Sequence, residues 1–125
     1  MTRRPVAVPS ETDEQKNVVD YLEWKKICYA HTPNEGKRST ITGHNLKQLG
    51  MKKGFPDLFI YEPVGEYHGL AIEMKALNGK PTMDQLKCLG ALKQRGYAAY
   101  IAYGANQAIR IIEAYMNGEL KHGNE

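Results

Sequence analysis

The chain has 125 residues, 42% of them apolar, which is enough to fill the core of one small domain but not of two. Its formal net charge of +3 permits a phosphate-rich partner and excludes a strongly cationic condenser of nucleic acid. No apolar run approaches the ~20 residues of a membrane helix, and residues 1–10 lack the apolar stretch of a secretion signal, so we expect an intracellular protein with no membrane contact.

Helix and strand signals predict a mixed α/β domain with the element order αβββαβα. Helices are expected at about 11–25, 83–96 and 105–118, and strands within 27–33, 57–63, 69–76 and 97–104. Ser10 and Thr82 are suitable N-caps for the first two helices, and the short connection after the second strand predicts an antiparallel hairpin. We therefore expect a mixed sheet with a helix on each face, formed by residues 11–117 between a flexible N-terminal segment (1–10) and a C-terminal tail (118–125).

A long polar excursion, residues 34–54, separates the first two predicted strands. It carries two basic pairs, Lys37 with Arg38 and Lys52 with Lys53. Long loops in small domains are more often functional than incidental, and basic loops hold a nucleic-acid backbone without reading its sequence. A solvated loop explains the same residues, so the phosphate contact depends on what the neighbouring strands carry.

The next two strands carry three charged residues in a suggestive arrangement. Alternate side chains of a strand share a face, so Glu73 and Lys75 point one way while the apolar side chains between them point to the core. Asp57, at the start of the preceding strand, comes within reach if the two strands pair. Converging carboxylates repel each other unless a divalent cation such as Mg²⁺ lies between them, and the Met74 carbonyl offers a further oxygen ligand. Lys75 would then orient or deprotonate a water, or neutralise a phosphate oxygen, which suits phosphodiester hydrolysis. The alternative is an ordinary ion pair on a solvated strand, with Asp57 in a turn.

The stretches around these charges resemble a known nuclease family. They are "GFPDLFIYEP" (54–63), "GLAIEMKALNGKPTMDQLKCLGALKQRGYAAYIAYG" (69–104), "ETDEQKNVVDYL" (11–22) and "PNEGKRS" (33–39). Together they resemble VRR-NUC (virus-type replication-repair nuclease) domains, a branch of the PD-(D/E)XK nuclease superfamily, over about Glu11 to Tyr115. The resemblance implies a central mixed sheet flanked by helices, in a stand-alone protein of the phage or bacterial type in the cytoplasm of a bacterium or of an infected host.

The resemblance also implies a role for each motif residue. The implied catalytic residues are Asp57, Glu73, Lys75, Gln85 and Glu14, and the implied metal ligands are Asp57, Glu73, the Met74 carbonyl and Glu14. Gln85 matches the glutamine that supports the site, and Glu14 an acidic residue of the first helix that approaches the metal. Glu11 competes with Glu14 for that last role. Lys37, Arg38, Lys52 and Lys53 are the expected DNA-binding residues.

The implied activity is Mg²⁺- or Mn²⁺-dependent endonuclease cleavage of DNA, at four-way (Holliday) junctions, by a homodimer. A two-fold dimer supplies the two coordinated cuts that resolving a junction requires, and exposed apolar groups on the first or last helix are candidate contact surfaces. Trp24 is expected in the core, and no phosphate-cradling loop for a nucleotide cofactor is found. The alternatives are a catalytically silent module that binds branched DNA, and a nuclease that prefers flaps or other DNA structures. Sequence-specific restriction is disfavoured because no helix-turn-helix or zinc-finger pattern occurs.

Overall fold

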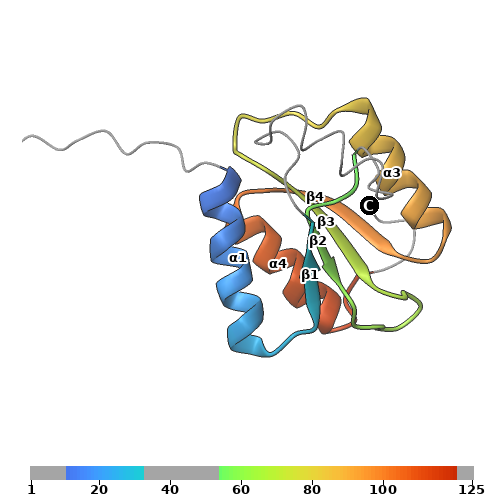
Figure 1. Ribbon diagram of the computed structural model, residues 1–125. Coiled ribbons are helices and arrows are strands. Elements are labelled where there is room, and N and C mark those ends of the chain that lie inside the picture. The colour runs from blue at the N-terminus through green and yellow to red at the C-terminus, as the bar shows by residue number, and fades with distance from the viewer. Residues whose placement is uncertain (1–10, 33–53, 121–125) are drawn as a thin grey trace, which may run out of the picture.

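A four-stranded mixed sheet with helices on both faces makes up the part of the chain that the computed structural model describes, residues 11–32 and 54–120 (Figure 1). The helices are α1 (Glu11–Lys25), α3 (Met83–Gln94) and α4 (Ala105–Met116), and the strands are β1 (Tyr29–His31), β2 (Leu58–Ile60), β3 (Leu70–Lys75) and β4 (Ala98–Tyr103). The mixed α/β fold and the element order expected from the sequence are confirmed.

The strands lie side by side in the order β1-β2-β3-β4. β2 is antiparallel to both β1 and β3, so the hairpin expected between the second and third strands is confirmed. β3 and β4 run parallel, from Leu70 opposite Ala98 to Lys75 opposite Tyr103, and α3 makes the crossover between them. The C-terminal ends of both strands therefore lie side by side, next to the start of α4.

Side-chain alternation gives each face of the sheet its own apolar core. The larger core lies under α1 and α4 and takes in one set of alternate strand residues together with Val18 and Leu22 of α1. The smaller core lies under α3 and consists of Phe59, Ala71, Leu89 and Ala99. Figure 1 shows α1 and α4 on one face of the sheet and α3 on the other. Because Glu73 and Lys75 share the parity of Ala71, both side chains project to the α3 face.

The predicted helices agree closely with the structure, whereas the strands are shorter than expected. α1 spans the predicted residues, but its expected cap, Ser10, lies outside the described residues. The prediction of Trp24 in the core is wrong, because its side chain is 73% exposed. The buried face of α1 is set by Val18 and Leu22, and a residue two positions after Leu22 points to the opposite side of a helix.

The cysteines form no disulfide bond within the described residues: Cys28 is exposed and Cys88 is half-buried, and both are free thiols. Within residues 11–32 and 54–120, no helix combines the length and the apolar content that a membrane crossing requires.

Candidate active site

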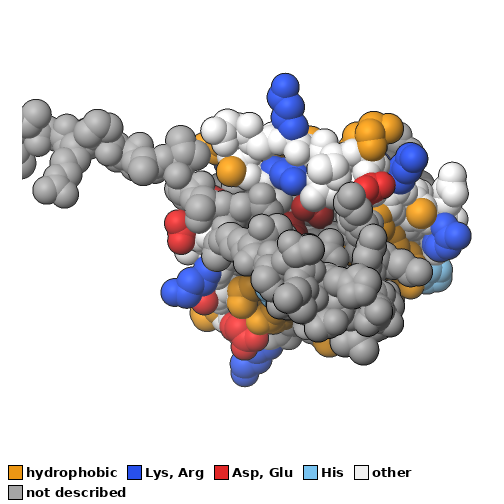
Figure 2. Space-filling view, turned by 45° about the horizontal axis from the view of Figure 1, so that its top comes forward, with side chains coloured by type: hydrophobic (Ala, Val, Ile, Leu, Met, Phe, Trp, Pro, Cys, Tyr) orange, Lys and Arg blue, Asp and Glu red, His pale blue; other side chains and the backbone are white. Residues whose placement is uncertain are grey.

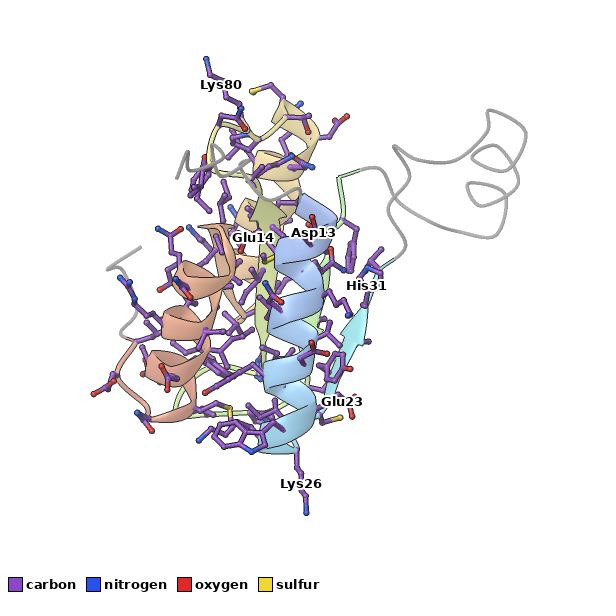
Figure 3. All side chains as sticks on the ribbon, turned by 90° about the vertical axis from the view of Figure 1, so that its left-hand side faces the viewer. Asp13, Glu14, Glu23, Lys26, His31 and Lys80 are labelled. Atoms are coloured by element: carbon purple, nitrogen blue, oxygen red, sulfur yellow. The ribbon has the colours of Figure 1, made fainter. Side chains whose placement is uncertain are left out.

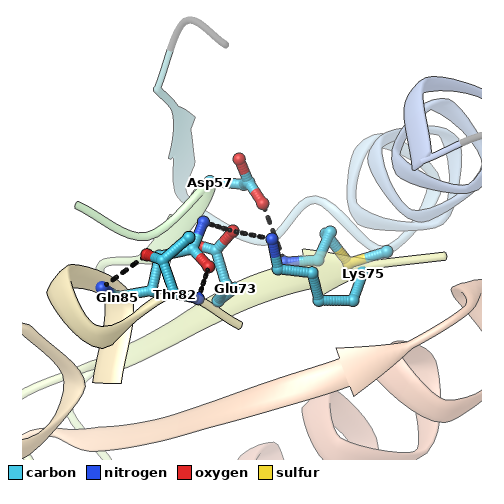
Figure 4. Close-up of polar contacts among 6 residues, drawn as sticks. Asp57, Glu73, Lys75, Thr82 and Gln85 are labelled. Carbon is cyan, nitrogen blue, oxygen red and sulfur yellow. Dashed lines mark hydrogen bonds and ion pairs between the residues drawn. The ribbon is translucent and has the colours of Figure 1, made fainter. Parts of the chain in front are cut away.

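Strand pairing brings Asp57 and Glu73 together. Leu58 of β2 pairs with Ile72 of β3, so the next pair outward sets Asp57 opposite Glu73 on the α3 face. A carboxylate oxygen of Asp57 accepts a hydrogen bond from the Met74 N–H at 2.8 Å, which extends the pairing past the end of β2 (Figure 4). Both residues are buried, with 8% of Asp57 and 2% of Glu73 exposed. An ion pair on a solvated strand therefore does not describe this site.

Burial raises the pKa of the Asp57 carboxyl group above its ordinary value. The Met74 N–H, a hydrogen bond with the Glu73 side chain, and the nearby Lys75 and His31 oppose that rise without cancelling it. Two buried carboxyl groups that share a hydrogen bond hold one proton between them more readily than two negative charges. A cation between them would relieve the same repulsion.

Lys75 lies on the same face, two residues after Glu73. Its Nζ is 3.9 Å from a carboxylate oxygen of Glu73, and its side chain is largely buried. Its backbone carbonyl accepts a hydrogen bond from the Gly104 N–H at 3.1 Å, which ties the end of β3 to the start of α4. Lys75 is thus held in place by two contacts, its side chain by Glu73 and its backbone carbonyl by Gly104, and its amine lies beside the carboxylate pair.

Gln85 links the first turn of α3 to the carboxylate pair (Figure 4). Its Nε2 donates to a Glu73 carboxylate oxygen at 3.0 Å, and its Oε1 accepts from the Thr82 N–H at 2.8 Å. Thr82 Oγ1 accepts in turn from the Gln85 N–H at 3.1 Å, which completes a capping box. Because the helix cap occupies the amide oxygen, the amide nitrogen must face Glu73. The expected Thr82 cap is confirmed. The cap was predicted from the sequence without its connection to the site, and the T-x-x-Q spacing of Thr82 and Gln85 is the signal that connects the two.

Gly54 fixes the distance between the turn before Asp57 and the start of α3. Its φ is +83°, and a Cβ built on it would lie 2.6 Å from the backbone carbon of Asp84 and 2.7 Å from the Asp84 carbonyl oxygen. Only a glycine allows this approach between two backbones. The close packing brings Asp57 and Gln85, which lie on separate segments, to the same site.

The donor atoms fit a hard divalent cation. Mg²⁺ in proteins is commonly held by one or two carboxylates, with water and substrate phosphate oxygens as the remaining ligands. Alternate residues of a strand direct their backbone groups to opposite neighbours, and the Met74 N–H faces Asp57 while the Lys75 carbonyl faces Gly104. The Met74 carbonyl is therefore directed to the Asp57 side. Within the described residues no group of three or more His, Cys, Asp or Glu side chains is arranged to hold a metal, so a bound ion would rely on two carboxylates, this carbonyl, water and phosphate.

The Glu14 side chain contacts the start of α4. Its carboxylate accepts a hydrogen bond from the Ala105 N–H, beside Gly104. Figure 3 shows Glu14 in the half of α1 that lies toward Lys80, far from Glu23 and Lys26 at the other end of the helix. The preceding Gly104 N–H donates to the Lys75 carbonyl, so residues 104 and 105 link Glu14 to the end of β3.

Several predicted site residues lie outside the described residues: Lys37, Arg38, Lys52, Lys53 and the side chain of Glu11. Figure 2 shows both basic and acidic side chains of the described part around the rim of this face, with further acidic side chains near its middle.

Comparisons with known proteins show the family of the chain. The family model described as "VRR-NUC domain" matches residues 9–106. A solved structure of a protein named "VRR_NUC domain protein" is 28% identical, with 90% of this chain and 92% of that chain covered and a TM-score of 0.78. No protein with a curated description matches the chain. Since the family model covers most of the chain and the fold agrees over nearly its whole length, the chain belongs to the VRR-NUC domain family, a nuclease-type domain.

Proposed function

We propose that the protein is a Mg²⁺- or Mn²⁺-dependent endonuclease that hydrolyses phosphodiester bonds in branched DNA, in the manner of PD-(D/E)XK nucleases. One observation carries the proposal: two buried, hydrogen-bonded carboxyl groups, Asp57 and Glu73, lie beside the Nζ of Lys75. Buried charges are costly unless they are paired or bind a cation, so a purely structural role gives no reason to place these groups together. Membership of a nuclease-type family supports the same conclusion.

Asp57, Glu73 and the Met74 carbonyl would hold the ion. When bound, the ion polarises the scissile phosphate and offsets the negative charge that develops there. The two carboxylates would hold the ion in one place, because the Met74 N–H fixes Asp57 and the Gln85 amide fixes Glu73. The cation would offset the repulsion between the two buried carboxylates.

Lys75 supplies the second positive charge. In the hydrolysis a water molecule loses a proton as its oxygen attacks phosphorus, the bond from phosphorus to the leaving oxygen breaks, and the leaving oxygen takes up a proton. The Lys75 amine can orient the attacking water or donate a hydrogen bond to a phosphate oxygen as charge builds on it. Glu73, 3.9 Å away, keeps the amine directed to this position.

Gln85 and Thr82 act as positioning residues. The Gln85 amide donates to Glu73, so it favours the negatively charged form that a cation requires. Thr82 fixes the direction of that amide through the helix cap. Glu14 is proposed as a residue that steadies the start of α4, and its role as a metal ligand remains a prediction.

The proposed substrate is branched DNA, with four-way junctions as the first candidate, and the proposed assembly is a homodimer in DNA repair. A single site makes one cut, whereas resolving a junction takes two, and a two-fold dimer supplies the second site. Lys37, Arg38, Lys52 and Lys53 are proposed to hold the DNA backbone, which would make binding fall steeply as salt rises.

A catalytically silent branched-DNA-binding module is the competing function. It is disfavoured because a pure binder gains nothing from buried carboxylates aimed at a polyanion. A nuclease that prefers flaps or other structures uses the same chemistry and differs only in substrate shape.

The test is cleavage of a labelled panel of duplex, flap, fork and four-way DNA by the wild type and by Lys75→Ala. We expect nicking of branched DNA with Mg²⁺ or Mn²⁺, none with EDTA, and none by the variant. Binding of branched DNA with no metal-dependent nicking would refute the endonuclease and favour the binding module.

A further inference from the structure

The exposed apolar side chains of the described residues concentrate on the segments that supply the active site. In residues 11–32 and 54–120, the well-exposed large apolar side chains are Trp24, Phe55, Tyr61, Leu77, Met83 and Leu86. Four of these six lie on two short segments, 54–57 and 73–86, which also carry the carboxylate pair, the lysine and the glutamine of the site. Single apolar side chains scattered over a surface need no explanation, whereas a set gathered at a site indicates a ligand with apolar groups.

Loop 76–82, which connects β3 to α3, carries an exposed leucine and an exposed lysine. Leu77 is 63% exposed, and its Cδ2 would lie 3.6 Å from a Cβ built on Gly104, so Leu77 lies beside the start of α4. Lys80 is exposed on the same loop. Figure 3 shows Lys80 projecting from the end of the molecule where Glu14 lies. The loop therefore presents an apolar and a basic side chain to solvent at the active-site end.

Both ends of this loop are tied to the active site. Just before the loop, the Lys75 carbonyl accepts a hydrogen bond from the Gly104 N–H at 3.1 Å. At its end, Thr82 forms the capping box that joins the loop to α3. Between them, the Gly79 N–H donates to the Ala76 carbonyl at 2.9 Å and closes a tight turn. The exposed side chains of the loop are therefore held at a fixed place relative to the catalytic strand.

An apolar side chain next to a basic one fits the chemistry of a nucleotide, which joins a base to an anionic phosphate. DNA-binding proteins insert leucine and other apolar side chains between base steps, while basic side chains contact the backbone. In a continuous duplex each base is covered by its neighbours, so inserting a side chain costs unstacking energy. At a branch point the stack is already interrupted, and the cost is smaller.

Resting on the proposed endonuclease function, we propose that loop 76–82 selects branched DNA: Leu77 inserts against the unstacked bases at the branch point, and Lys80 contacts a neighbouring phosphate. Because Leu77 follows Lys75 by two residues, the branch point would be held beside the phosphate that is cut. Leu77 is then a specificity-determining residue and not a catalytic one. The selection takes place within one protomer.

The two exposed aromatic residues elsewhere suit this role less well. Tyr61 follows the end of β2 that is remote from Asp57, and its ring packs against Phe59 with the ring centroids 4.7 Å apart. The Trp24 ring is covered by the Lys25 Nζ at 4.8 Å from its centroid. Tyr61 therefore provides a control, since it is 53% exposed and lies outside the loop.

The test compares the affinities for forked DNA and for duplex of the same length, measured by fluorescence anisotropy in Mg²⁺. Every protein carries Lys75→Met, which removes the amine proposed for cleavage, so that the DNA stays intact. We expect Leu77→Ser to lower the preference for the fork at least about fivefold without changing the affinity for duplex, and Leu77→Met to keep the preference. Lys80→Gln should weaken binding of both DNAs and lower the salt slope by about one. The control Tyr61→Ser should leave the preference unchanged.

A 2-aminopurine base at the branch point reports the insertion directly, because its fluorescence rises when the base is unstacked. The fluorescence should rise on binding and should rise less when Leu77→Ser is added. An unchanged fork preference in Leu77→Ser, or an equal loss of affinity for fork and duplex, would overturn the proposal. A loss of preference accompanied by a large fall in Tm would assign Leu77 to packing and would also overturn it.

Nicking of the same fork and duplex in Mg²⁺ is scored with Lys75 present. If the wild type nicks the fork and Leu77→Ser nicks it with the same preference over duplex, the role of the loop alone is refuted. A wild type that nicks no DNA refutes the endonuclease function, while a fork preference in binding that Leu77→Ser abolishes would still support the loop.

Discussion

Replacing Gly54 with alanine tests whether the turn before Asp57 is positioned by direct packing on α3. The new Cβ would lie 2.6 Å from the Asp84 backbone carbon, 2.7 Å from its carbonyl oxygen and 2.9 Å from its Cβ. These partners are mainly backbone at the start of a helix, so they cannot move aside as a flexible side chain would. Either the turn or the first turn of α3 must shift, and Asp57 would then move relative to Gln85.

The expected loss has two parts that a matched variant separates. An alanine at positive φ costs about 1 kcal/mol of unfolding free energy, and forcing an extra methyl group into a packed position costs about 1–3 kcal/mol more. Gly65 also has a positive φ, of +59°, but a Cβ there meets nothing within 4 Å of the described residues. Gly65→Ala should therefore lose only about 1 kcal/mol, and Gly54→Ala about 2–4 kcal/mol.

Urea unfolding of the two variants and the wild type measures these losses, and Mg²⁺ titration by calorimetry reports on the site. We expect Gly54→Ala to weaken Mg²⁺ binding at temperatures where it is still folded, and Gly65→Ala to leave binding unchanged. Equal losses of stability in the two variants would show that the backbone angle alone matters, and the packing argument would be refuted.

Three further predictions concern the site itself. Lys75→Met keeps the aliphatic stem and removes the charge, so cleavage should fall at least about 100-fold while Mg²⁺ affinity measured by calorimetry holds or rises; unimpaired cleavage would contradict the role of the amine. Burial raises the pKa of Asp57 in the folded protein above its ordinary value of 3.8. At a pH between the ordinary and the raised pKa, the folded protein therefore binds more protons than the unfolded chain, and the free energy of unfolding in EDTA should fall as the pH rises through this range. Asp57→Asn should remove this fall. If the unfolding free energies of the wild type and the variant change with pH in parallel, the raised pKa of Asp57 is refuted as the cause. Thr82→Ala should lose about 1 kcal/mol of unfolding free energy and lower kcat, with Thr82→Ser restoring both, since serine keeps the capping hydroxyl; a stability loss with full activity would limit Thr82 to the helix cap.

The charged side chains of the site were predictable because strand parity is a strong rule. Once 70–75 is read as a strand with an apolar face, Glu73 and Lys75 must share the opposite face, and a hairpin must bring Asp57 alongside. The same rule separates the two cores. α1 and its buried pair, Val18 and Leu22, also follow from spacing alone, because helical periodicity repeats over several turns.

Contacts between segments distant in the sequence were not predictable, because no local pattern encodes them. Nothing near Gly54 in the sequence indicates that it packs on Asp84, and nothing near Glu14 indicates that its carboxylate meets the Ala105 N–H. Trp24 was predicted in the core because large apolar side chains are usually buried. It is exposed because it lies on the opposite side of α1 from the buried Leu22. The basic loop residues lie outside the described part of the chain, so their DNA contacts stay predictions.

The hydrogen bond from the Met74 N–H to Asp57 allows a structural role of Asp57 to be tested separately from a metal-binding role. β2 begins at Leu58, so the Met74 N–H has passed the last backbone partner on that side, and the Asp57 side chain takes the place of the missing strand. An asparagine oxygen accepts the same hydrogen bond without the charge, whereas alanine leaves a buried N–H unsatisfied, at a cost of about 1–3 kcal/mol. Asp57→Asn should therefore stay folded and lose Mg²⁺ binding, and Asp57→Ala should lose both stability and binding. If Asp57→Asn binds Mg²⁺ as the wild type does in calorimetry, the carboxylate at 57 is a structural acceptor and not a metal ligand.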